Sequence, residues 1–312
     1  MKIAYLVMAH DQPTLFARLI GALAGPDVHF YAHIDAKSDA APFREAVSST
    51  PVHFVAAPVR VNWGGYSQVS AMLSLLQLAA QHGPHDYYVF LSGRDYPLRS
   101  QRAISAHLEA GGGTSYMNFY PLTEGVDFVA KVRRHCYYDL YARLPGRWLR
   151  RVANRLVREV SNMLPARTFI LGMQPYRGST SWCLSQPVVA YLLAFVADPA
   201  NYIYLKFFHS VNCADEIFFQ TIVLNSPLAS TLQNYEQDVL QRAIGEMKNE
   251  NKVSLHYIDW NPVREDPAIF DTGDFLALIG SGKFFARKFD TVKSAAVLDM
   301  LDAARHADNG RN

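Results

Sequence analysis

The first hundred residues alternate short apolar runs with segments of helical periodicity, and few folds accommodate this alternation. Residues 3–8 form an unbroken apolar run, which is typical of a parallel strand buried on both faces. Similar runs at 28–34, 52–56 and 87–91 predict three further strands. Strands that alternate with helices indicate an α/β fold with a mostly parallel central sheet and right-handed crossovers.

Two segments between these runs have helical periodicity. The first begins at Pro13, which suits the first turn of a helix, and one face carries Leu15, Phe16, Leu19, Ile20 and Leu23. The second follows Ser67 and carries Val69, Met72, Leu73, Leu76 and Ala80 on one face. Further along, residues 169–195 predict a strand, a turn region at 172–185 and a helix. A polar stretch at 240–252 precedes another predicted strand at 253–260.

Length, charge and cysteine content restrict the class of protein. The 312 residues are 50% hydrophobic, so a sizeable core is expected, and the net charge of +2 argues against a nucleic-acid binder. The three cysteines lack metal-type spacing and argue against a disulfide framework. The N-terminus turns polar too early for a signal peptide, and no apolar run is long enough to span a membrane. We therefore expect a cytoplasmic protein.

Polar and aromatic residues follow the ends of the predicted strands. His10, Asp35, Trp63 and Asp95 each come just after an apolar run. Ligands of α/β sheets bind at the carboxyl ends of the strands, so these residues are candidates for a binding site. No glycine-rich fingerprint follows the first strand, which disfavours a nicotinamide enzyme.

Two adjacent carboxylates, Asp215 and Glu216, precede a strongly apolar stretch that is predicted to be a helix, with Ser210 or Asn212 as its cap. Acidic residues are common in a first helical turn because they suit its positive end. The alternative interpretation is functional: a carboxylate held ionised at a helix N-terminus can take a proton from a nucleophile.

Residues 131–163 are rich in arginine. Apolar residues at helical spacing, among them Trp148, Leu156 and Met163, could line the opposite face of a helix. A solvated helix packed on the domain is one interpretation. The other is a basic amphipathic element that makes peripheral contact with an anionic membrane or an acidic acceptor.

A set of motifs spread over most of the chain resembles a known family. In chain order they are Val7-Met-Ala-His10, His33-Ile-Asp35-Ala-Lys37-Ser, Trp63-Gly-Gly-Tyr-Ser67, Phe90-Leu-Ser-Gly-Arg-Asp95-Tyr-Pro-Leu98, Gly178-Ser-Thr-Ser-Trp182, Asp215-Glu216, His256-Tyr-Ile-Asp-Trp260, Thr272-Gly-Asp274-Phe and Phe285-Ala-Arg-Lys288-Phe-Asp290. Their order and spacing resemble the core-2/I-branching type β-1,6-N-acetylglucosaminyltransferases and the related peptide O-xylosyltransferases.

The resemblance implies a GT-A fold, a Rossmann-like α/β sheet, in one domain over 1–312. That domain would comprise a nucleotide-binding half (1–130), a basic helical insertion (131–165) and an acceptor and catalytic half with a phosphate-binding tail (166–312). The family inverts the anomeric centre and needs no metal cofactor. Here an Arg94-Asp95 pair stands where most GT-A enzymes place an Asp-x-Asp metal site. One aspartate beside an arginine is a poor site for a hard dication.

The resemblance also assigns roles to residues. Glu216 matches the catalytic base, with Asp215 as its rival or its orienting neighbour. Lys288 and Arg264 match a basic pair that stabilises the departing UDP, and Arg287 is the substitute for Arg264. His10 and Asp35 match uridine contacts. We expect Trp63 and Trp182 to form platforms for sugar rings, and Asp95 to contact the donor or acceptor sugar.

These observations predict an inverting, metal-independent glycosyltransferase that moves a sugar, GlcNAc first and xylose as the alternative, from a UDP-sugar to a glycan or lipid-linked acceptor. Two other classes stay open. A non-catalytic sugar-nucleotide or carbohydrate-binding protein would not need the carboxylate of Glu216. A nucleotidyltransferase would need metal carboxylates and a glycine-rich phosphate loop, and neither is found. The acceptor and the oligomeric state are not predicted.

Overall fold

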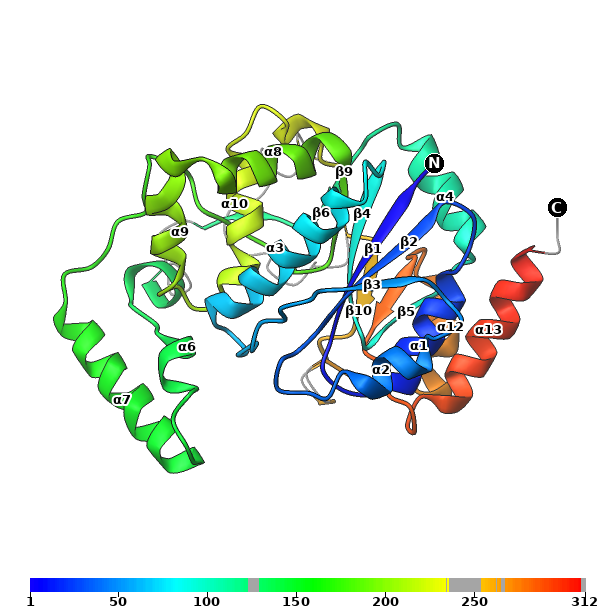
Figure 1. Cartoon of the computed structure of the whole chain (residues 1–312), viewed down its shortest axis with the longest axis horizontal. Coiled ribbons are helices and arrows are strands. Elements are labelled where there is room, and N and C mark those ends of the chain that lie inside the picture. The colour runs from blue at the N-terminus through cyan, green and yellow to red at the C-terminus, as the bar shows by residue number, and fades with distance from the viewer. Residues whose placement is uncertain (123–128, 234, 236–253, 262, 265–266, 310–312) are drawn as a thin grey trace.

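The computed structural model describes residues 1–122, 129–233, 235, 254–261, 263–264 and 267–309 (Figure 1). Its centre is a six-stranded sheet in the order β3-β2-β1-β4-β9-β6. Four strands run parallel: β1 (Ile3–Ala9), β2 (Val28–Ile34), β3 (Val52–Phe54) and β4 (Tyr87–Ser92). The strand β9 (Trp182–Ser185) runs antiparallel to β4 and to β6 (Tyr116–Met117).

Helices cover both faces of this sheet (Figure 1). One face packs against α1 (Pro13–Leu23) and α13 (Ala295–Asn309), and the other against α3 (Tyr66–Gln81), α8 (Gln186–Ala197) and α10 (Phe218–Leu224). Alternate residues of β1 join the two cores: Tyr5 and Val7 pack on the α1 side, whereas Ala4 and Leu6 pack on the α3 side. Burial on both faces explains why this strand is continuously apolar.

The remaining elements form two smaller sheets and several further helices. A second sheet has the order β10-β11-β5, with β10 (His256–Ile258), β11 (Phe285–Arg287) and β5 (Asp95–Pro97), and a two-stranded sheet joins β7 (Tyr120–Pro121) to β8 (Tyr176–Arg177). The other helices are α2 (Ala41–Ala46), α4 (Gln101–Ala110), α6 (Tyr138–Tyr141), α7 (Arg147–Met163), α9 (Tyr202–Phe208) and α12 (Phe275–Gly280). Single helical turns occupy Val129–Arg133, Pro199–Asn201, Ala214–Glu216, Ala229–Thr231 and Thr272–Asp274.

The predicted α/β architecture with a largely parallel sheet flanked by helices is confirmed. The five apolar residues predicted for the first helix are all buried in α1. The prediction for 169–185 is wrong in detail, because residues 165–175 contain no strand and β9 lies inside the expected turn region. Phe169 and Ile170 are apolar because they pack against the core without strand partners. The polar stretch at 240–252 lies outside the described residues.

In the part of the chain that the structure describes, no single helix has the length and apolarity of a membrane span, although Gln186–Ala197 and Pro199–Phe208 meet the criterion as a pair bent by 75°.

Candidate active site

A cavity of about 280 Å³ lies at the carboxyl ends of β1, β2 and β4. This is the edge at which α/β sheets bind their ligands. The cavity is lined by Met8, Ala9, His10, Asp35, Lys37, Val61, Trp63, Gln68, Met72, Phe90, Ser92, Thr180 and Arg287. Three residues singled out in the sequence, His10, Asp35 and Trp63, therefore lie around one hollow.

The two residues expected to contact uridine differ in their surroundings. The Asp35 carboxylate is buried at the end of β2, where Oδ1 accepts hydrogen bonds from the backbone N–H groups of Lys37 (2.9 Å) and Val61 (3.3 Å). The ammonium of Lys37 lies 3.3 Å from Oδ2. The ring of His10 is exposed at the rim, 3.5 Å from Asp11. Asp35 is thus fixed in place, and His10 is accessible to a ligand.

Trp63 lies on a loop that connects the cavity to the carboxylate pair. Its side chain is 79% exposed. The next residue, Gly64, has a φ of +77°, a conformation that favours glycine, and its carbonyl accepts a hydrogen bond from Cys213 N (3.0 Å). The side chain of Gln68 lines the cavity and donates to Asp215 Oδ2 at 3.1 Å. The carboxylate pair is therefore adjacent to the cavity.

Glu216 has two cationic partners. Its Oε2 accepts hydrogen bonds from Lys131 Nζ (2.7 Å) and Arg177 Nε (2.8 Å). Asp215 and Glu216 lie near the start of α10, as predicted, but in a separate single turn, and the predicted cap by Ser210 or Asn212 is wrong because α10 begins at Phe218 without a side-chain cap. A helix terminus is therefore not what holds this carboxylate in place. Two ion pairs do so.

Asp215 has the opposite environment. Its side chain is buried, and Oδ1 has no hydrogen-bond partner among the described residues. Burial, and next the neighbouring charge of Glu216, raise the pKa of Asp215 to about 7. The Asp215 side chain is also closed off from a substrate, because it is buried and its Oδ2 is occupied by Gln68, whereas the side chain of Glu216 is 26% exposed. Of the two carboxylates, Glu216 is the better placed to act on a substrate.

The raised pKa of Asp215 predicts a pH-dependent effect of Asp215→Asn. Between the unfolded value of 3.8 and about 7 the folded protein binds this proton more tightly than the unfolded chain, so the stabilisation is complete below 3.8 and lost as pH rises through 7. The slope is at most roughly 1.4 kcal/mol per pH unit. The Tm of Asp215→Asn relative to wild type should therefore rise steadily from acidic to neutral pH. A Tm difference independent of pH would contradict this assignment.

Gly178 holds the backbone next to Glu216. Its N–H donates to the carbonyl of Glu216 (2.8 Å), and a Cβ at this position would overlap the carbonyl oxygen of Asn118. Gly178→Ala is therefore expected to displace β8 and with it Arg177, and to destabilise the fold by roughly 1–3 kcal/mol, as overpacking does. Thermal unfolding measures this change. Gly280→Ala is the matched control, because a Cβ there meets nothing within 4 Å; equal losses in both variants would refute the steric argument.

The basic residues predicted to bind phosphate occupy three different positions. The guanidinium of Arg264 is paired with Asp274 (2.8 and 2.9 Å) and Asp259 (3.1 Å), and it does not line the cavity. Arg287, the substitute, lines the cavity at the end of β11. Lys288 follows it directly and is half-buried, outside the residues that line the cavity. The structure thus favours Arg287 over Arg264 for contact with a ligand.

Two further residues fall outside the cavity. Asp95 is buried and accepts hydrogen bonds from Ser92 N (2.8 Å) and Arg287 Nη1 (3.1 Å), with His256 at 3.4 Å. It positions Arg287 instead of offering its oxygens to a sugar. Trp182 is 1% exposed and packs between Phe90 and Phe219 in the core, so it does not fit the expected sugar platform.

Lys131 and Arg177, the two partners of Glu216, have no role that the sequence predicts. Lys131 opens the basic segment, and Arg177 precedes the Gly178-Ser-Thr-Ser-Trp182 motif. The position of Arg177 beside a family motif is the one sequence signal for a functional role. It does not identify Glu216 as the partner, because Lys131 and Arg177 are 85 and 39 residues from Glu216 in the chain.

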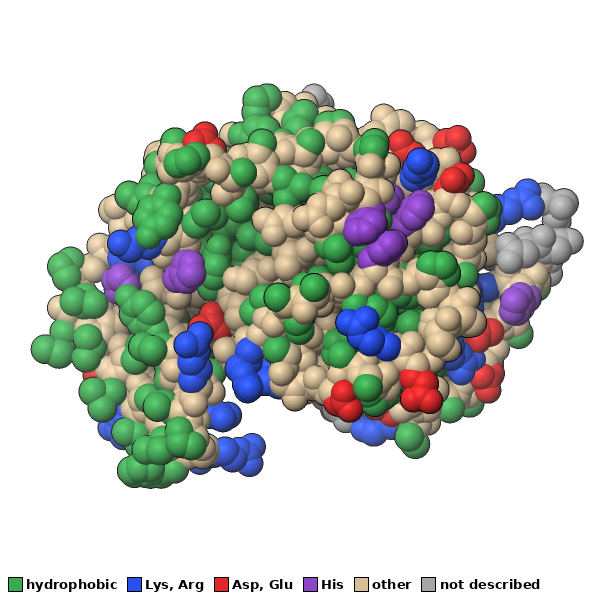
Figure 2. Space-filling view, viewed as in Figure 1, with side chains coloured by type: hydrophobic (Ala, Val, Ile, Leu, Met, Phe, Trp, Pro, Cys, Tyr) green, Lys and Arg blue, Asp and Glu red, His purple; other side chains and the backbone are tan. Residues whose placement is uncertain are grey.

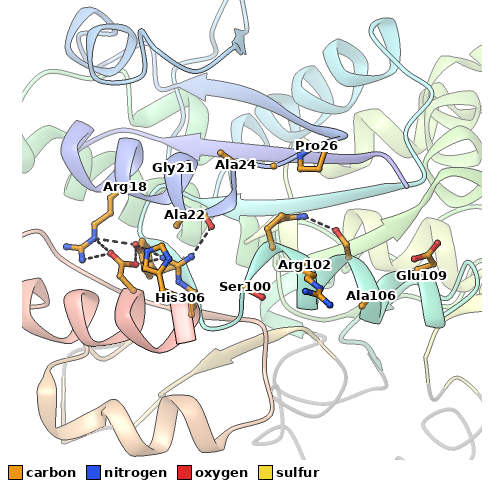
Figure 3. A pocket seen from close by; sticks show the side chains of 16 residues that line it. Arg18, Gly21, Ala22, Ala24, Pro26, Ser100, Arg102, Ala106, Glu109 and His306 are labelled. Atoms are coloured by element: carbon orange, nitrogen blue, oxygen red, sulfur yellow. Dashed lines mark hydrogen bonds and ion pairs between the residues drawn. The ribbon is translucent and has the colours of Figure 1, made fainter. Parts of the chain in front are cut away.

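A larger hollow of about 940 Å³ lies between α1, α4 and α13 (Figure 3). The C-terminal end of α1 borders it, which places it at the edge of the sheet opposite to the carboxyl ends of the strands. Three of its charged groups are paired with one another, because Asp302 accepts hydrogen bonds from Arg18 and Arg305 as well as from Tyr96. We therefore assign no catalytic role to this hollow.

Known proteins resemble this chain over most of its length. A model of the family described as Core-2/I-Branching enzyme matches residues 3–279. Xylosyltransferase 2 of Rattus norvegicus is 26% identical over 321 residues, covering 97% of this chain and 33% of its own length. Xylosyltransferase 1 of Mus musculus is 24% identical, covering 97% of this chain and 30% of its own. The chain thus spans about a third of the length of these relatives.

Among solved structures, the mannose-1-phosphate geranyltransferase from Thermus thermophilus matches over 78% of this chain and 66% of its own, with a TM-score of 0.26 and 10% identity. A similarity at this level supports no functional argument.

Proposed function

The chain belongs to the Core-2/I-branching enzyme family, and on this premise we propose that it is a glycosyltransferase that moves a sugar from a UDP-sugar to a hydroxyl group of a glycan or lipid-linked acceptor. The observation that carries the proposal is the carboxylate of Glu216, held by Lys131 and Arg177 beside the cavity at the carboxyl ends of the strands. A protein that only binds sugars has no need of such a carboxylate.

In the proposed reaction Glu216 is the general base. It accepts the proton of the acceptor hydroxyl while that oxygen bonds to the anomeric carbon of the donor. The bond from this carbon to UDP breaks on the opposite face, its electron pair leaves with the diphosphate, and the anomeric configuration inverts. Both cations contact Oε2 of Glu216, so we assign the proton transfer to Oε1.

The negative charge that develops on UDP requires a cation. We propose that Arg287 and Lys288 supply it, since Arg287 lines the cavity and Lys288 follows it at the end of β11. Among the described residues, no group of three or more His, Cys, Asp or Glu side chains could hold a metal ion. Asp95, the carboxylate at the usual metal position, is buried and engaged by Arg287. These contacts support transfer without a divalent metal.

The donor sugar is open between two candidates. The family description names branching enzymes, and the curated relatives at 24–26% identity are xylosyltransferases, so UDP-GlcNAc and UDP-xylose have comparable support. The two sugars differ in the acetamido and hydroxymethyl groups, and Thr180, Met72 and Phe90 are cavity residues that could contact them.

A UDP-release assay with purified protein over a panel of UDP-sugars, with glycan and lipid-linked acceptors present, tests this proposal. Release from UDP-GlcNAc or UDP-xylose, slower by roughly 10²-fold or more in Glu216→Gln, is the expected result. UDP binding without release from any donor would favour a non-catalytic sugar-nucleotide binding protein. If the protein neither binds nor releases UDP, the proposed function is refuted.

A further inference from the structure

The helix α7 carries an exposed apolar face. It has 17 residues and is about 25 Å long. Its side chains at 3.6-residue spacing form one apolar face made of Trp148, Leu149, Val152, Leu156, Val160 and Met163, all exposed. Trp148 is 71%, Leu156 60% and Met163 85% exposed. A face of this kind ordinarily packs against a core, and here it does not.

The opposite face of α7 is basic. Its arginines are Arg147, Arg150, Arg151, Arg155 and Arg158, and Glu159 is the one acidic residue of the helix. Figure 2 shows hydrophobic side chains with Lys and Arg beside them on the part of the molecule that Figure 1 labels α7. A helix with one apolar and one cationic face has the composition of helices that lie in the plane of a membrane surface.

The C-terminal end of α7 is bound to the body of the protein. Ser161, buried on the side of α7 that faces the body, accepts a hydrogen bond from His135 N (2.6 Å). Arg167, just beyond the helix, donates to Ser210 Oγ (2.8 Å) and to the carbonyl of Arg134 (2.8 Å). The helix is therefore attached near its C-terminal end, and its apolar face stays exposed.

The same segment is joined to the candidate active site. Lys131, at its start, pairs with Glu216. Asp139 of α6 accepts hydrogen bonds from Ser67 N (2.9 Å) and Asn62 Nδ2 (2.8 Å), next to the loop that carries Trp63. A surface that held α7 would therefore also position the opening of the cavity.

We propose that α7 docks on an anionic lipid bilayer, with its apolar face in the acyl region and its arginines at the phosphate headgroups. Charge complementarity selects this occupant. A second copy of the chain that packed on the same face would bring two arginine-rich helices together, and like charges at close range oppose such pairing. Resting on the proposed function, the docked enzyme would act on an acceptor held at the membrane.

Vesicle flotation of the full chain tests docking. The wild type should bind phosphatidylcholine vesicles that contain phosphatidylglycerol and bind pure phosphatidylcholine far more weakly, and high salt should reduce binding. The double variant Trp148→Ser/Leu156→Ser should bind the anionic vesicles at least roughly tenfold more weakly, since two buried apolar side chains are lost. Both residues are exposed, so the fold should be retained.

Leu276→Ser is the matched control, because Leu276 is 76% exposed on α12. It should bind vesicles as the wild type does. No binding of the wild type to anionic vesicles at low salt would overturn the proposal, as would equal losses in the double variant and the control. A dimer in light scattering that the double variant abolishes would instead assign the face to a second copy. UDP binding in solution, measured in parallel, reports on the proposed function separately, because it does not depend on vesicles.

Discussion

Glu216→Gln should lower turnover by roughly 10²–10⁴-fold and leave the affinity for the UDP-sugar nearly unchanged, because general-base assistance contributes about that factor. The amide keeps the shape of the side chain and its contacts to Lys131 and Arg177 as an acceptor, but it cannot take a proton. Steady-state UDP release gives the turnover, and calorimetric titration with UDP gives the affinity.

Glu216→Gln also leaves Lys131 and Arg177 without a negative counter-charge, which can lower the stability of the fold. The Tm of the variant must therefore be measured together with its turnover. Glu109→Gln is the matched control, since Glu109 is exposed on α4 at the opposite edge of the sheet. The control should retain wild-type turnover. Near-normal turnover in a folded Glu216→Gln variant would remove the base assignment, and a fall in turnover matched by the control would show an effect unrelated to the site.

Arg287→Met should slow transfer by about 10²-fold or more, the size typical for loss of one donor to a developing negative charge, and it should also weaken UDP binding. Arg287 lines the cavity and is positioned by Asp95. Burial alone would raise the pKa of Asp95, but its partners His256 and Arg287 hold that pKa below the ordinary value. The variant removes a cation at the place where the diphosphate is proposed to lie. Titration with UDP and the rate of UDP release measure the two effects.

Arg264→Met distinguishes this role from a purely structural one. Arg264 is bound to Asp259 and Asp274, so its loss should lower the Tm and leave UDP affinity unchanged. Equal losses of UDP affinity in Arg264→Met and Arg287→Met would show that Arg264 also binds the diphosphate. Unchanged affinity in Arg287→Met would leave Lys288 as the candidate.

Residues 1–98 show how far the sequence predicts the fold. The strands β1 and β4 there are buried on both faces and α1 and α3 are amphipathic, so local patterns carry the information, and the predicted strand at 28–34 coincides with β2. The later strands β8 and β9 are harder to predict because they have only two and four residues. Such short segments adopt a strand conformation because they pair with strands distant in the sequence, and not because of their own composition.

The candidate site divides in the same way. Asp35 could be predicted because it directly follows a strand, and the carboxyl ends of parallel strands meet at one edge of the sheet. The ion pairs of Glu216 could not, since they join segments far apart in the chain. The structural role of Arg264 had a local signal, because Asp259 and Asp274 lie five and ten residues away. The family motif directed attention to phosphate binding instead.

The most direct test of the account is UDP release by the wild type from its preferred UDP-sugar in the presence of excess EDTA. If Arg287 and Lys288 take the place of a divalent ion, the rate should be the same with EDTA as with added Mn²⁺. A rate that collapses in EDTA and returns when Mn²⁺ is restored would contradict the account.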